Sequence, residues 1–332
     1  MVKNNLSAIA KEIFETRTEQ DFERLALEIF RFQSDQNSVY KNYIQQIHVN
    51  PSSIISIEQI PFLPIEFFKN MKVVSGEKSD EIVFTSSGTT GSEQSQHHIA
   101  DISIYEKSYR TCFEKFYGKP EDYCMLALLP SYLERSGSSL IYMMEDLIKR
   151  SKHPVSGFYL HNHDSLNETL LRLKSQKQKT ILLGVTYALL DFIEKYPVQF
   201  PELIVMETGG MKGKRKEMIR EELHELLCKG FGVAHIHSEY GMTELLSQGY
   251  SKGNGIFETP PWMKILTRDT NDPLQLTASN QTGGINVIDL ANIYSCSFIA
   301  TQDLGRTDPD GKFEVLGRFD ASDVRGCNLL VQ

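Results

Sequence analysis

Apolar side chains recur with helical spacing near the beginning of the chain. Five of them occupy positions i, i+3, i+4, i+7 and i+8, which places them on one face of a helix: Phe22, Leu25, Ala26, Ile29 and Phe30. Thr18 precedes this run and is followed three residues later by Asp21, the spacing of a capping pair. Residues 1–48 are therefore predicted to be helical.

The next segment mixes prolines with apolar residues. The prolines interrupt any regular element, whereas the isoleucines and phenylalanines around them require burial. Residues 51–68 are therefore expected to form an ordered connector that packs on the core. Two short strands, Met71–Ser75 and Glu81–Phe84, are predicted to follow it.

Short, continuously apolar runs then alternate with amphipathic segments. The predicted strands are Tyr123–Leu129, Thr180–Leu183, Leu203–Met206 and Val233–His237. The predicted helices are Ser138–Arg150, Ser165–Lys174, Tyr187–Lys195 and Lys214–Cys228. Apolar strands separated by helices are typical of a parallel sheet covered on both faces. Ligands in such sheets bind at the carboxyl ends of the strands.

The pattern changes after residue 254. Strand-like runs now alternate with polar turns, at Met263–Leu266, Ile285–Leu290, Ser297–Ala300 and Phe313–Leu316. This alternation of strand-like runs and turns predicts a smaller β-rich subdomain. The predicted fold class is therefore α/β, with a helical N-terminal segment (1–80) packed on an α/β core (81–254), and a β-rich subdomain with a tail (255–332).

Composition narrows the classes of function. The 332 residues are 40% hydrophobic, enough for a large core. A net charge of −8 without a basic block argues against a nucleic-acid partner. Five cysteines without a C-x-x-C pair fit a reducing cytoplasm better than a disulfide framework. No signal-peptide pattern and no run of about 20 apolar residues is found, so a cytoplasmic chain without a membrane span is expected.

A loop rich in hydroxyl groups and glycine follows the predicted strand Glu81–Phe84. It contains no large apolar side chain, so it does not belong to a core. Backbone N–H groups and hydroxyls in such a loop can surround an anion, and glycine lets the backbone approach closely. The phosphate tail of a nucleotide is the obvious anion, and a flexible linker is the alternative. The candidate ligands are Ser86, Ser87, Gly88, Thr89, Thr90 and Gly91.

Two later clusters carry groups that suit a nucleotide. In Tyr240-Gly241-Met242-Thr243-Glu244 the aromatic ring can stack on a purine, the hydroxyl can contact phosphate, and the carboxylate can hold Mg²⁺. Further along, Asp303 can accept both hydroxyls of a ribose, and Arg318 can meet ribose or phosphate oxygens. The alternatives are an ordinary strand-to-helix turn for the first cluster and a hairpin with charged turns for the second.

Together, and in this order, the three clusters resemble the motifs of the adenylate-forming superfamily, which includes acyl-CoA synthetases, peptide-synthetase adenylation domains and luciferases. The loop is similar to the phosphate loop of that family, and Tyr240 to Glu244 matches its Y-G-x-T-E motif. Asp303 and Arg318 match its ribose-binding aspartate and its hinge-region arginine. Thr208-Gly209-Gly210 resembles its adenine-contacting turn.

The resemblance implies ATP and Mg²⁺ as cofactors, with catalytic roles for Thr243, Glu244 and Arg318 and with Glu244 as the metal ligand. Two departures from the family pattern matter. The family loop continues with a lysine, whereas Gly91 is followed by Ser92-Glu93-Gln94, so Mg²⁺ or another residue must supply the positive charge. The mobile C-terminal lid of the family is expected to be absent, because 14 residues follow Arg318.

Within the superfamily, Leu129–Arg135 and Asp323–Cys327 resemble the acyl-protein synthetases of bacterial bioluminescence operons (the LuxE family), relatives of phenylacetate-CoA ligase. This resemblance implies that a fatty acid is activated with ATP, carried on a cysteine near the C-terminus and handed to a partner acyl reductase. Cys327 occupies the position of that cysteine, and an inert terminal cysteine is the alternative. Arg325 is a candidate for lowering the pKa of the thiol.

Two other functions stay open. One is an acyl- or aryl-CoA ligase whose lid is supplied by another chain. The other is a non-catalytic nucleotide-binding module, suggested by the missing loop lysine. The identity of the acid is not readable from the sequence. Its pocket is expected among residues near predicted strand ends: Tyr132, Ser138, Gly184, Val185, Thr186 and Tyr187.

Overall fold

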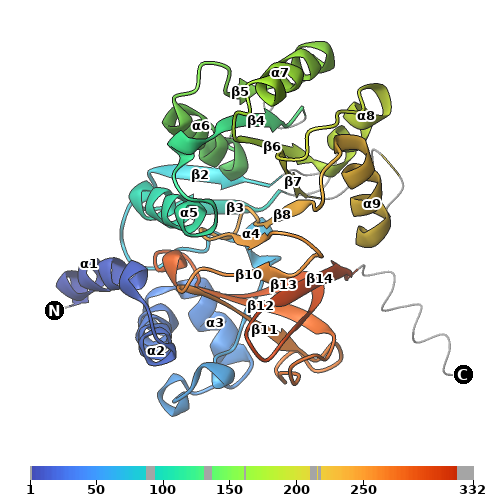
Figure 1. The fold of residues 1–332 in the computed structure, drawn as a ribbon. Coiled ribbons are helices and arrows are strands. Elements are labelled where there is room, and N and C mark those ends of the chain that lie inside the picture. Colours follow the sequence, from blue (N-terminus) through green and yellow to red (C-terminus); the bar gives the residue numbers. More distant parts are fainter. Residues whose placement is uncertain are drawn as a thin grey trace, which may run out of the picture. The chain divides into compact units, whose positions relative to one another are not determined.

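The computed structural model describes residues 2–86, 94–130, 137–160, 162–209, 215 and 218–319, with side chains from residue 6 onward. The chain divides into two compact units, whose elements are labelled in Figure 1. The first unit comprises Met1–Ser108, Glu244–Ser247 and Glu258–Gln332, and the second comprises Tyr109–Thr243 and Gln248–Phe257. The boundaries predicted after residues 80 and 254 stay predictions, because compactness alone does not define an independently folding domain.

The first unit combines helices from the beginning of the chain with strands from its last third. Its helices are α1 (Val2–Glu12), α2 (Glu19–Gln36), α3 (Ser38–Gln46) and α4 (Phe67–Asn70), with 3-10 helices at Ile13–Glu15, Pro51–Ser53, Ile57–Gln59 and Leu290–Asn292. Its strands are β1 (Leu63–Pro64), β2 (Ile82–Thr85), β3 (Gln96–Ile99), β11 (Met263–Arg268), β12 (Gly283–Asp289), β13 (Phe298–Thr307) and β14 (Phe313–Arg318).

Strands β11 to β14 pair in sequence order as an antiparallel sheet, and β1 adds to β13 in parallel. Strands β2 and β3 form a separate antiparallel pair. Helices α2 and α3 pack on the larger sheet through aromatic rings, since the rings of Phe30 and Tyr40 lie 6.0 and 6.1 Å from that of Phe298. Figure 1 draws both helices beside this sheet. The core of the first unit is therefore built from residues far apart in sequence.

The predicted cap at the start of α2 is confirmed. The Asp21 N–H donates to the Thr18 hydroxyl at 3.1 Å, and the Thr18 N–H donates to the Asp21 carboxylate at 3.1 Å. The hydrogen bonds from Thr18 and from the neighbouring backbone lower the pKa of Asp21. The apolar face predicted for this helix is buried as expected.

The second unit is a parallel sheet with helices between its strands. Its helices are α6 (Ser139–Ser151), α7 (His163–Ser175), α8 (Thr186–Lys195) and α9 (Arg220–Phe231), with a 3-10 helix at Pro120–Asp122. Its strands are β4 (Cys124–Leu128), β5 (Gly157–Phe158), β6 (Thr180–Val185), β7 (Ile204–Thr208), β8 (His237–Tyr240) and β9 (Gly249–Ser251). Helix α5 (Ile102–Tyr117) and strand β10 (Phe257–Glu258) each span a boundary between the units.

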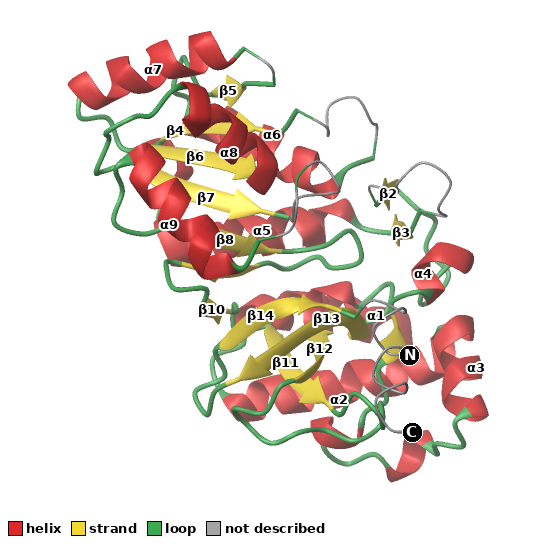
Figure 2. Cartoon of the chain, turned by 90° about the vertical axis from the view of Figure 1, so that its right-hand side faces the viewer, coloured by secondary structure: helices red, strands yellow, loops and turns green. Residues whose placement is uncertain are grey.

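Strands β5, β4, β6, β7 and β8 pair in this order, all in parallel, and β9 pairs with β8 antiparallel. Helices α8 and α9 pack against each other, and α8 packs on β6 and β7. Figure 2 shows these two helices in front of the parallel strands. The residues of β4 and β6 are buried without exception, as their continuous apolar runs predict. The parallel α/β core predicted from the sequence is confirmed.

Three predicted elements are wrong. Met71–Ser75 is not a strand, because its backbone is anchored elsewhere, with the Ser75 N–H donating to the Tyr294 carbonyl at 2.8 Å. The helix predicted to begin at Lys214 begins at Arg220. The strand predicted at Val233–His237 is β8, four residues later, because its ladder with β7 starts where His237 faces Met206.

No helix of the described residues is long and apolar enough to cross a membrane. The four cysteines among these residues, Cys112, Cys124, Cys228 and Cys296, carry free thiols. Three of them are buried, and Cys228 is half-buried.

Candidate functional site

The predicted phosphate loop connects β2 to β3 in the first unit. The Ser86 N–H donates to the Ser95 carbonyl at 3.0 Å, and the Ser95 N–H donates to the Ser86 hydroxyl at 2.9 Å. These two hydrogen bonds close the base of the connection, in continuation of the β2–β3 ladder. Ser87, Gly88, Thr89, Thr90 and Gly91 lie outside the described residues, so their phosphate-binding role stays a prediction.

Glu244 is buried in the first unit, next to the base of this loop. The side chain of Ser95 is hydrogen-bonded to its carboxylate. Burial raises the pKa of Glu244, while the hydrogen bonds and then the charges of Arg318 and Lys69 act in the opposite direction. A carboxylate in this environment has been removed from bulk water and faces cations, and an oxygen ligand of that kind suits Mg²⁺.

Asp289 fixes the segment that follows Glu244. Its buried carboxylate accepts hydrogen bonds from the N–H groups of Leu246 and Ser247, both at 2.9 Å, and from the Ser247 hydroxyl at 2.6 Å. The Asn292 amide donates to the carbonyl of Glu244 itself at 2.8 Å. Burial raises the pKa of Asp289 to about 6. These contacts hold the backbone of Glu244 in one position relative to β12.

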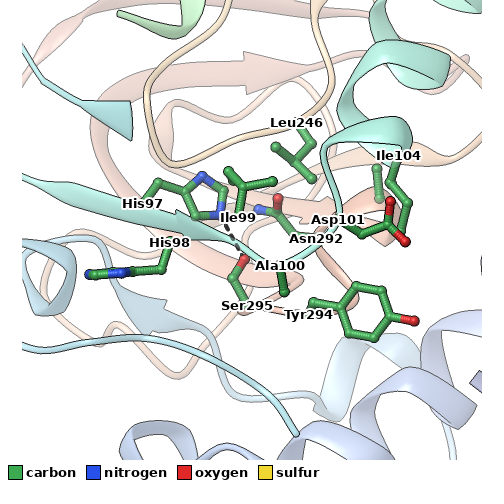
Figure 3. A pocket seen from close by; sticks show the side chains of 11 residues that line it. His97, His98, Ile99, Ala100, Asp101, Ile104, Leu246, Asn292, Tyr294 and Ser295 are labelled. Atoms are coloured by element: carbon green, nitrogen blue, oxygen red, sulfur yellow. Dashed lines mark hydrogen bonds between the residues drawn. The ribbon is translucent and has the colours of Figure 1, made fainter. Parts of the chain in front are cut away.

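A small cavity lies behind this segment. It has a volume of about 10 Å³ and is lined by residues that include His97, Leu246, Asn292 and Ser295. Figure 3 shows the His97 ring directed at the Ser295 hydroxyl, and a hydrogen bond of 2.8 Å joins them. A cavity of this size accommodates no more than one water molecule, so it is not a substrate pocket.

Asp303 and Arg318 face each other on the paired strands β13 and β14. The Arg318 Nε lies 3.2 Å from the Asp303 carboxylate. The Arg318 side chain is 72% exposed, whereas that of Asp303 is 11% exposed. The carboxylate is therefore held in place by the sheet, and the guanidinium remains accessible to a ligand.

In the second unit, β7 and β8 bring Thr208 beside Glu239. The Thr208 hydroxyl donates to the Glu239 carboxylate at 2.5 Å. At the beginning of α8, the Thr186 hydroxyl donates to the carbonyl of Gly209 at 2.5 Å. The predicted adenine-contacting turn is thus tied to the ends of two neighbouring strands. Gly210, the last residue of that turn, lies outside the described residues.

Two buried carboxylates lie at this edge of the second unit. Burial raises the pKa of Glu239 to about 7, an effect that the Thr208 hydrogen bond opposes and the charge of Glu207 adds to. The pKa of Glu207 lies below its usual value, because His224 and Arg220 outweigh its burial. The Arg220 guanidinium lies 2.9 Å from Glu207. Glu207 is therefore a compensated charge, and Glu239 is a carboxyl group that titrates near neutrality.

The Tyr240 to Glu244 motif begins in the second unit. Tyr240 is buried, and its ring packs edge-on against Phe257 at 6.1 Å. Gly241 lies so close to the preceding carboxylate that a Cβ at this position would come within 2.3 Å of Glu239 Oε1. A larger residue at position 241 would therefore require the Glu239 carboxylate to move. Thr243 is half-buried, and Glu244 belongs to the first unit.

The described site residues and the residues that contact them thus form two groups, one in each unit. The group in the first unit is called the carboxylate–arginine cluster below and consists of Ser86, Ser95, Glu244, Asp303 and Arg318. The group in the second unit consists of Thr208, Gly209, Tyr240 and Gly241, with Glu239 at its centre. Cys327 lies outside the described residues.

The residues predicted to form the acid pocket are only partly placed. Gly184, Val185, Thr186 and Tyr187 are buried at the end of β6 and the beginning of α8. Ser138 caps α6 by accepting the N–H of Ile141 at 3.3 Å. Tyr132 lies outside the described residues.

Sequence reasoning did not single out Ser95, Lys69, Glu239, Asp289 or Asn292. A recognisable pattern existed for Asp289, because it ends a mostly apolar run, and a carboxylate that is buried there needs hydrogen-bond donors. Lys69 stands in an exposed helical turn, and only its neighbours in space distinguish it.

The donor set of the carboxylate–arginine cluster fits the groups of Mg·ATP. A carboxylate beside an arginine can receive ribose hydroxyls, and serine hydroxyls can contact phosphate. Among the described residues, no group of three or more His, Cys, Asp or Glu side chains is placed to hold a metal ion. Mg²⁺ commonly takes one or two protein carboxylates and completes its shell with phosphates and water, so Glu244 is sufficient in kind.

Comparison with known proteins finds solved structures whose fold is similar to that of this chain. No protein-family model matches the chain, and no curated protein matches it significantly. ATP-bound MatB from Rhodopseudomonas palustris is similar, with 16% identity and a TM-score of 0.55, over 73% of this chain and 49% of that one. This chain therefore spans about half the length of MatB.

A second similar structure is 2-hydroxyisobutyryl-CoA ligase in an open conformation with 2-HIB-AMP and CoA. It has 12% identity and a TM-score of 0.66, over 92% of this chain and 72% of that one. At these identities the likeness concerns the fold alone. The predicted α/β fold is confirmed, and it is similar to the fold of these two proteins.

Proposed function

We propose that this chain activates a carboxylic acid with ATP as an acyl-adenylate and then transfers the acyl group to a thiol. The observation that carries the proposal is the carboxylate–arginine cluster. In it, Glu244 shares its surroundings with Ser95 from the phosphate-loop base and with Arg318, which pairs with Asp303. The likeness in fold to 2-hydroxyisobutyryl-CoA ligase supports the proposal.

Formation of the acyl-adenylate requires little acid–base catalysis. The substrate carboxylate is already ionised at neutral pH, so no base has to remove a proton from it. Its oxygen attacks the α-phosphorus of ATP, and pyrophosphate leaves with the electron pair of the broken P–O bond. Positioning and neutralisation of phosphate charge are what the protein must provide. Asp303 would orient the ribose, Arg318 would meet ribose or phosphate oxygens, and Glu244 would hold Mg²⁺.

The second step transfers the acyl group. A thiolate attacks the acyl carbonyl, the mixed anhydride breaks, and AMP leaves. We assign the thiol to Cys327, on its resemblance to the acceptor cysteine of the LuxE family. The same resemblance supports a long-chain fatty acid as the substrate and an acyl reductase as the partner that takes up the product.

Intact-protein mass spectrometry after incubation with ATP, Mg²⁺ and fatty acids of graded length tests both steps. We expect an acyl increment that requires ATP and disappears in Cys327→Ser. Cys228→Ser is the matched control, because Cys228 is half-buried whereas the other described cysteines are buried. The Cys228→Ser variant should still show the acyl increment. An increment that survives in Cys327→Ser would refute self-acylation and leave adenylation standing.

Acid-dependent exchange of labelled pyrophosphate into ATP tests adenylation separately. If no acid of a broad panel supports exchange while ATP still binds, the chain is a non-catalytic nucleotide-binding module instead.

An acyl-CoA ligase is the second candidate, favoured by the likeness to a CoA ligase over 92% of this chain. Thioester formation with coenzyme A that is unaffected by Cys327→Ser, in the presence or absence of a separately supplied lid domain, would decide for it.

A further inference from the structure

The chain enters the first unit for four residues between two stretches of the second unit. The segment Glu244–Ser247 belongs to the first unit, whereas Tyr109–Thr243 before it and Gln248–Phe257 after it belong to the second. Glu244, the predicted metal ligand, is the first of these four residues. The position of its carboxylate in the carboxylate–arginine cluster therefore depends on the contacts that this short segment makes inside the first unit.

A single turn of chain binds both ends of the segment. The 3-10 turn Leu290–Asn292 follows β12, and the carboxylate of Asp289 caps it by accepting the N–H of Ala291 at 3.1 Å. The same carboxylate binds the last two residues of the segment through the hydrogen bonds described above. From the other end of the turn, the Asn292 amide donates to the carbonyl of Glu244 at 2.8 Å. Two side chains three residues apart therefore fix the segment at its first residue and at its last two.

The hydrogen bond from Asn292 has one possible direction. A backbone carbonyl accepts hydrogen bonds and cannot donate them, so Asn292 must present its NH₂ group to Glu244. Asn292 is fully buried and Glu244 is 6% exposed, so this bond is formed away from bulk water. Leucine and aspartate have nearly the size of asparagine but carry no such donor. Either substitution at position 292 therefore removes the bond with little change in volume.

Both ends of the Glu244 side chain are held by other residues. Its carboxylate is hydrogen-bonded to the side chain of Ser95, and its backbone is held by Asn292. A glutamate side chain has several rotatable bonds, whereas Mg²⁺ requires its oxygen ligands in near-ideal octahedral geometry. Residues that orient a metal ligand without touching the metal commonly contribute tenfold or more to metal affinity. The hydrogen bond from Asn292 is suited to that role.

We propose that Asn292 is a positioning residue for Glu244, which it holds by its carbonyl so that the carboxylate can bind the Mg²⁺ of Mg·ATP. The proposal rests on the proposed ATP-dependent function. Asn292 acts through Glu244 and contacts neither the nucleotide nor the metal ion. Its removal should therefore weaken the Mg²⁺-dependent part of ATP binding and leave the remainder unchanged.

Isothermal titration calorimetry with ATP, at graded Mg²⁺ concentrations and in EDTA, measures the two parts without requiring turnover. In the natural chain we expect Mg²⁺ to strengthen ATP binding. In Asn292→Leu this strengthening should fall roughly tenfold, whereas ATP affinity in EDTA should stay unchanged. Asn292→Asp also lacks the donor and should show the same loss.

Asn37→Leu is the matched control. Asn37 is an equally buried asparagine of the first unit, and its amide donates to another backbone carbonyl, that of Ser295, also at 2.8 Å. This variant loses the same kind of hydrogen bond away from Glu244, so it should keep the full effect of Mg²⁺ on ATP binding. Urea unfolding followed by Trp262 fluorescence establishes that the first unit is folded in each variant.

A double-mutant cycle determines whether Asn292 acts through Glu244. Glu244→Gln removes the charge of the predicted metal ligand and should by itself abolish most of the Mg²⁺ effect. Adding Asn292→Leu to this variant should cause no further loss, because the residue that Asn292 positions no longer binds the metal. A further loss of the same size as in the single variant would refute the positioning role.

The remaining outcomes separate the two proposals. If Mg²⁺ strengthens ATP binding equally in the natural chain and in Asn292→Leu, the role of Asn292 is refuted and the proposed function stands. Equal losses of ATP affinity with Mg²⁺ and in EDTA would also refute it, since that pattern indicates a structural effect. If Glu244→Gln leaves the Mg²⁺ effect unchanged, Glu244 is not the metal ligand and the role of Asn292 is wrong as well. If the natural chain binds no ATP, both proposals are wrong.

Discussion

Replacement of Glu239 by glutamine should make the chain more stable above neutral pH. Glutamine has the shape of glutamate and keeps an oxygen that can accept the Thr208 hydroxyl, but it carries no charge. In the natural chain, burial raises the pKa of Glu239 from 4.5 to about 7. At 1.36 kcal/mol per pKa unit, a shift of this size corresponds to roughly 3 kcal/mol.

The sign follows from where the proton is held more tightly. Between pH 4.5 and 7 the folded chain keeps the proton on Glu239, whereas the unfolded chain releases it. The free energy of unfolding therefore falls as pH rises through this window, and the loss is complete above pH 7. Glutamine has no such loss. The variant should thus gain about 3 kcal/mol on the natural chain between pH 4.5 and pH 8.

Urea unfolding at a series of pH values between 4.5 and 8 measures this difference. Far-UV circular dichroism and Trp262 fluorescence should both be followed, because Trp262 lies in the first unit and Glu239 in the second. Glu225→Gln, which removes an exposed carboxylate from helix α9, is the control and should run parallel to the natural chain. Parallel curves for Glu239→Gln as well would refute the reasoning, since they would mean that Glu239 is ionised in the folded chain throughout.

Three further predictions concern the first unit. Asp289→Ala removes the buried acceptor of several hydrogen bonds, including those from Ser247, and should lower the free energy of unfolding by about 3 kcal/mol or more, measured by urea unfolding; a loss below about 1 kcal/mol would contradict the anchoring role. Asp303→Ala should weaken ATP binding roughly tenfold in calorimetry without weakening pyrophosphate binding, and an equal effect on both ligands would speak against a ribose contact. Thr18→Ala breaks the cap with Asp21 and should cost about 1 kcal/mol in thermal unfolding, whereas an unchanged midpoint would show that the cap contributes nothing.

Elements with a strong local pattern could be predicted from the sequence. The apolar face of α2 and its cap at Thr18 are local features, because helix periodicity and capping act within a few residues. The continuous apolar runs at β4 and β6 likewise required burial on both faces. The phosphate loop, the Tyr240 motif and Arg318 are recognisable for the same reason, because each is defined by neighbours along the chain.

The strand β8 shows where local pattern fails. Its residues His237, Ser238 and Glu239 are polar, so the strand was predicted at the more apolar residues before them. The ladder with β7 decided the outcome, since it pairs His237 with Met206 and Glu239 with Thr208. Hydrophobic periodicity cannot detect a strand whose buried polar groups are satisfied by neighbours from another strand.

The sequence by itself determined the order of elements and the identity of the chemical groups, because both depend on neighbours along the chain. Which groups share an environment was decided only by the tertiary structure. Ser95, Glu244 and Asn292 stand far apart in sequence, and folding of the first unit brings them into hydrogen-bonding contact. The pKa of Glu239 has the same origin, because burial and a hydroxyl from another strand set it. Electrostatic interactions and desolvation act through space, so their effects on the cluster emerge only when the chain has folded.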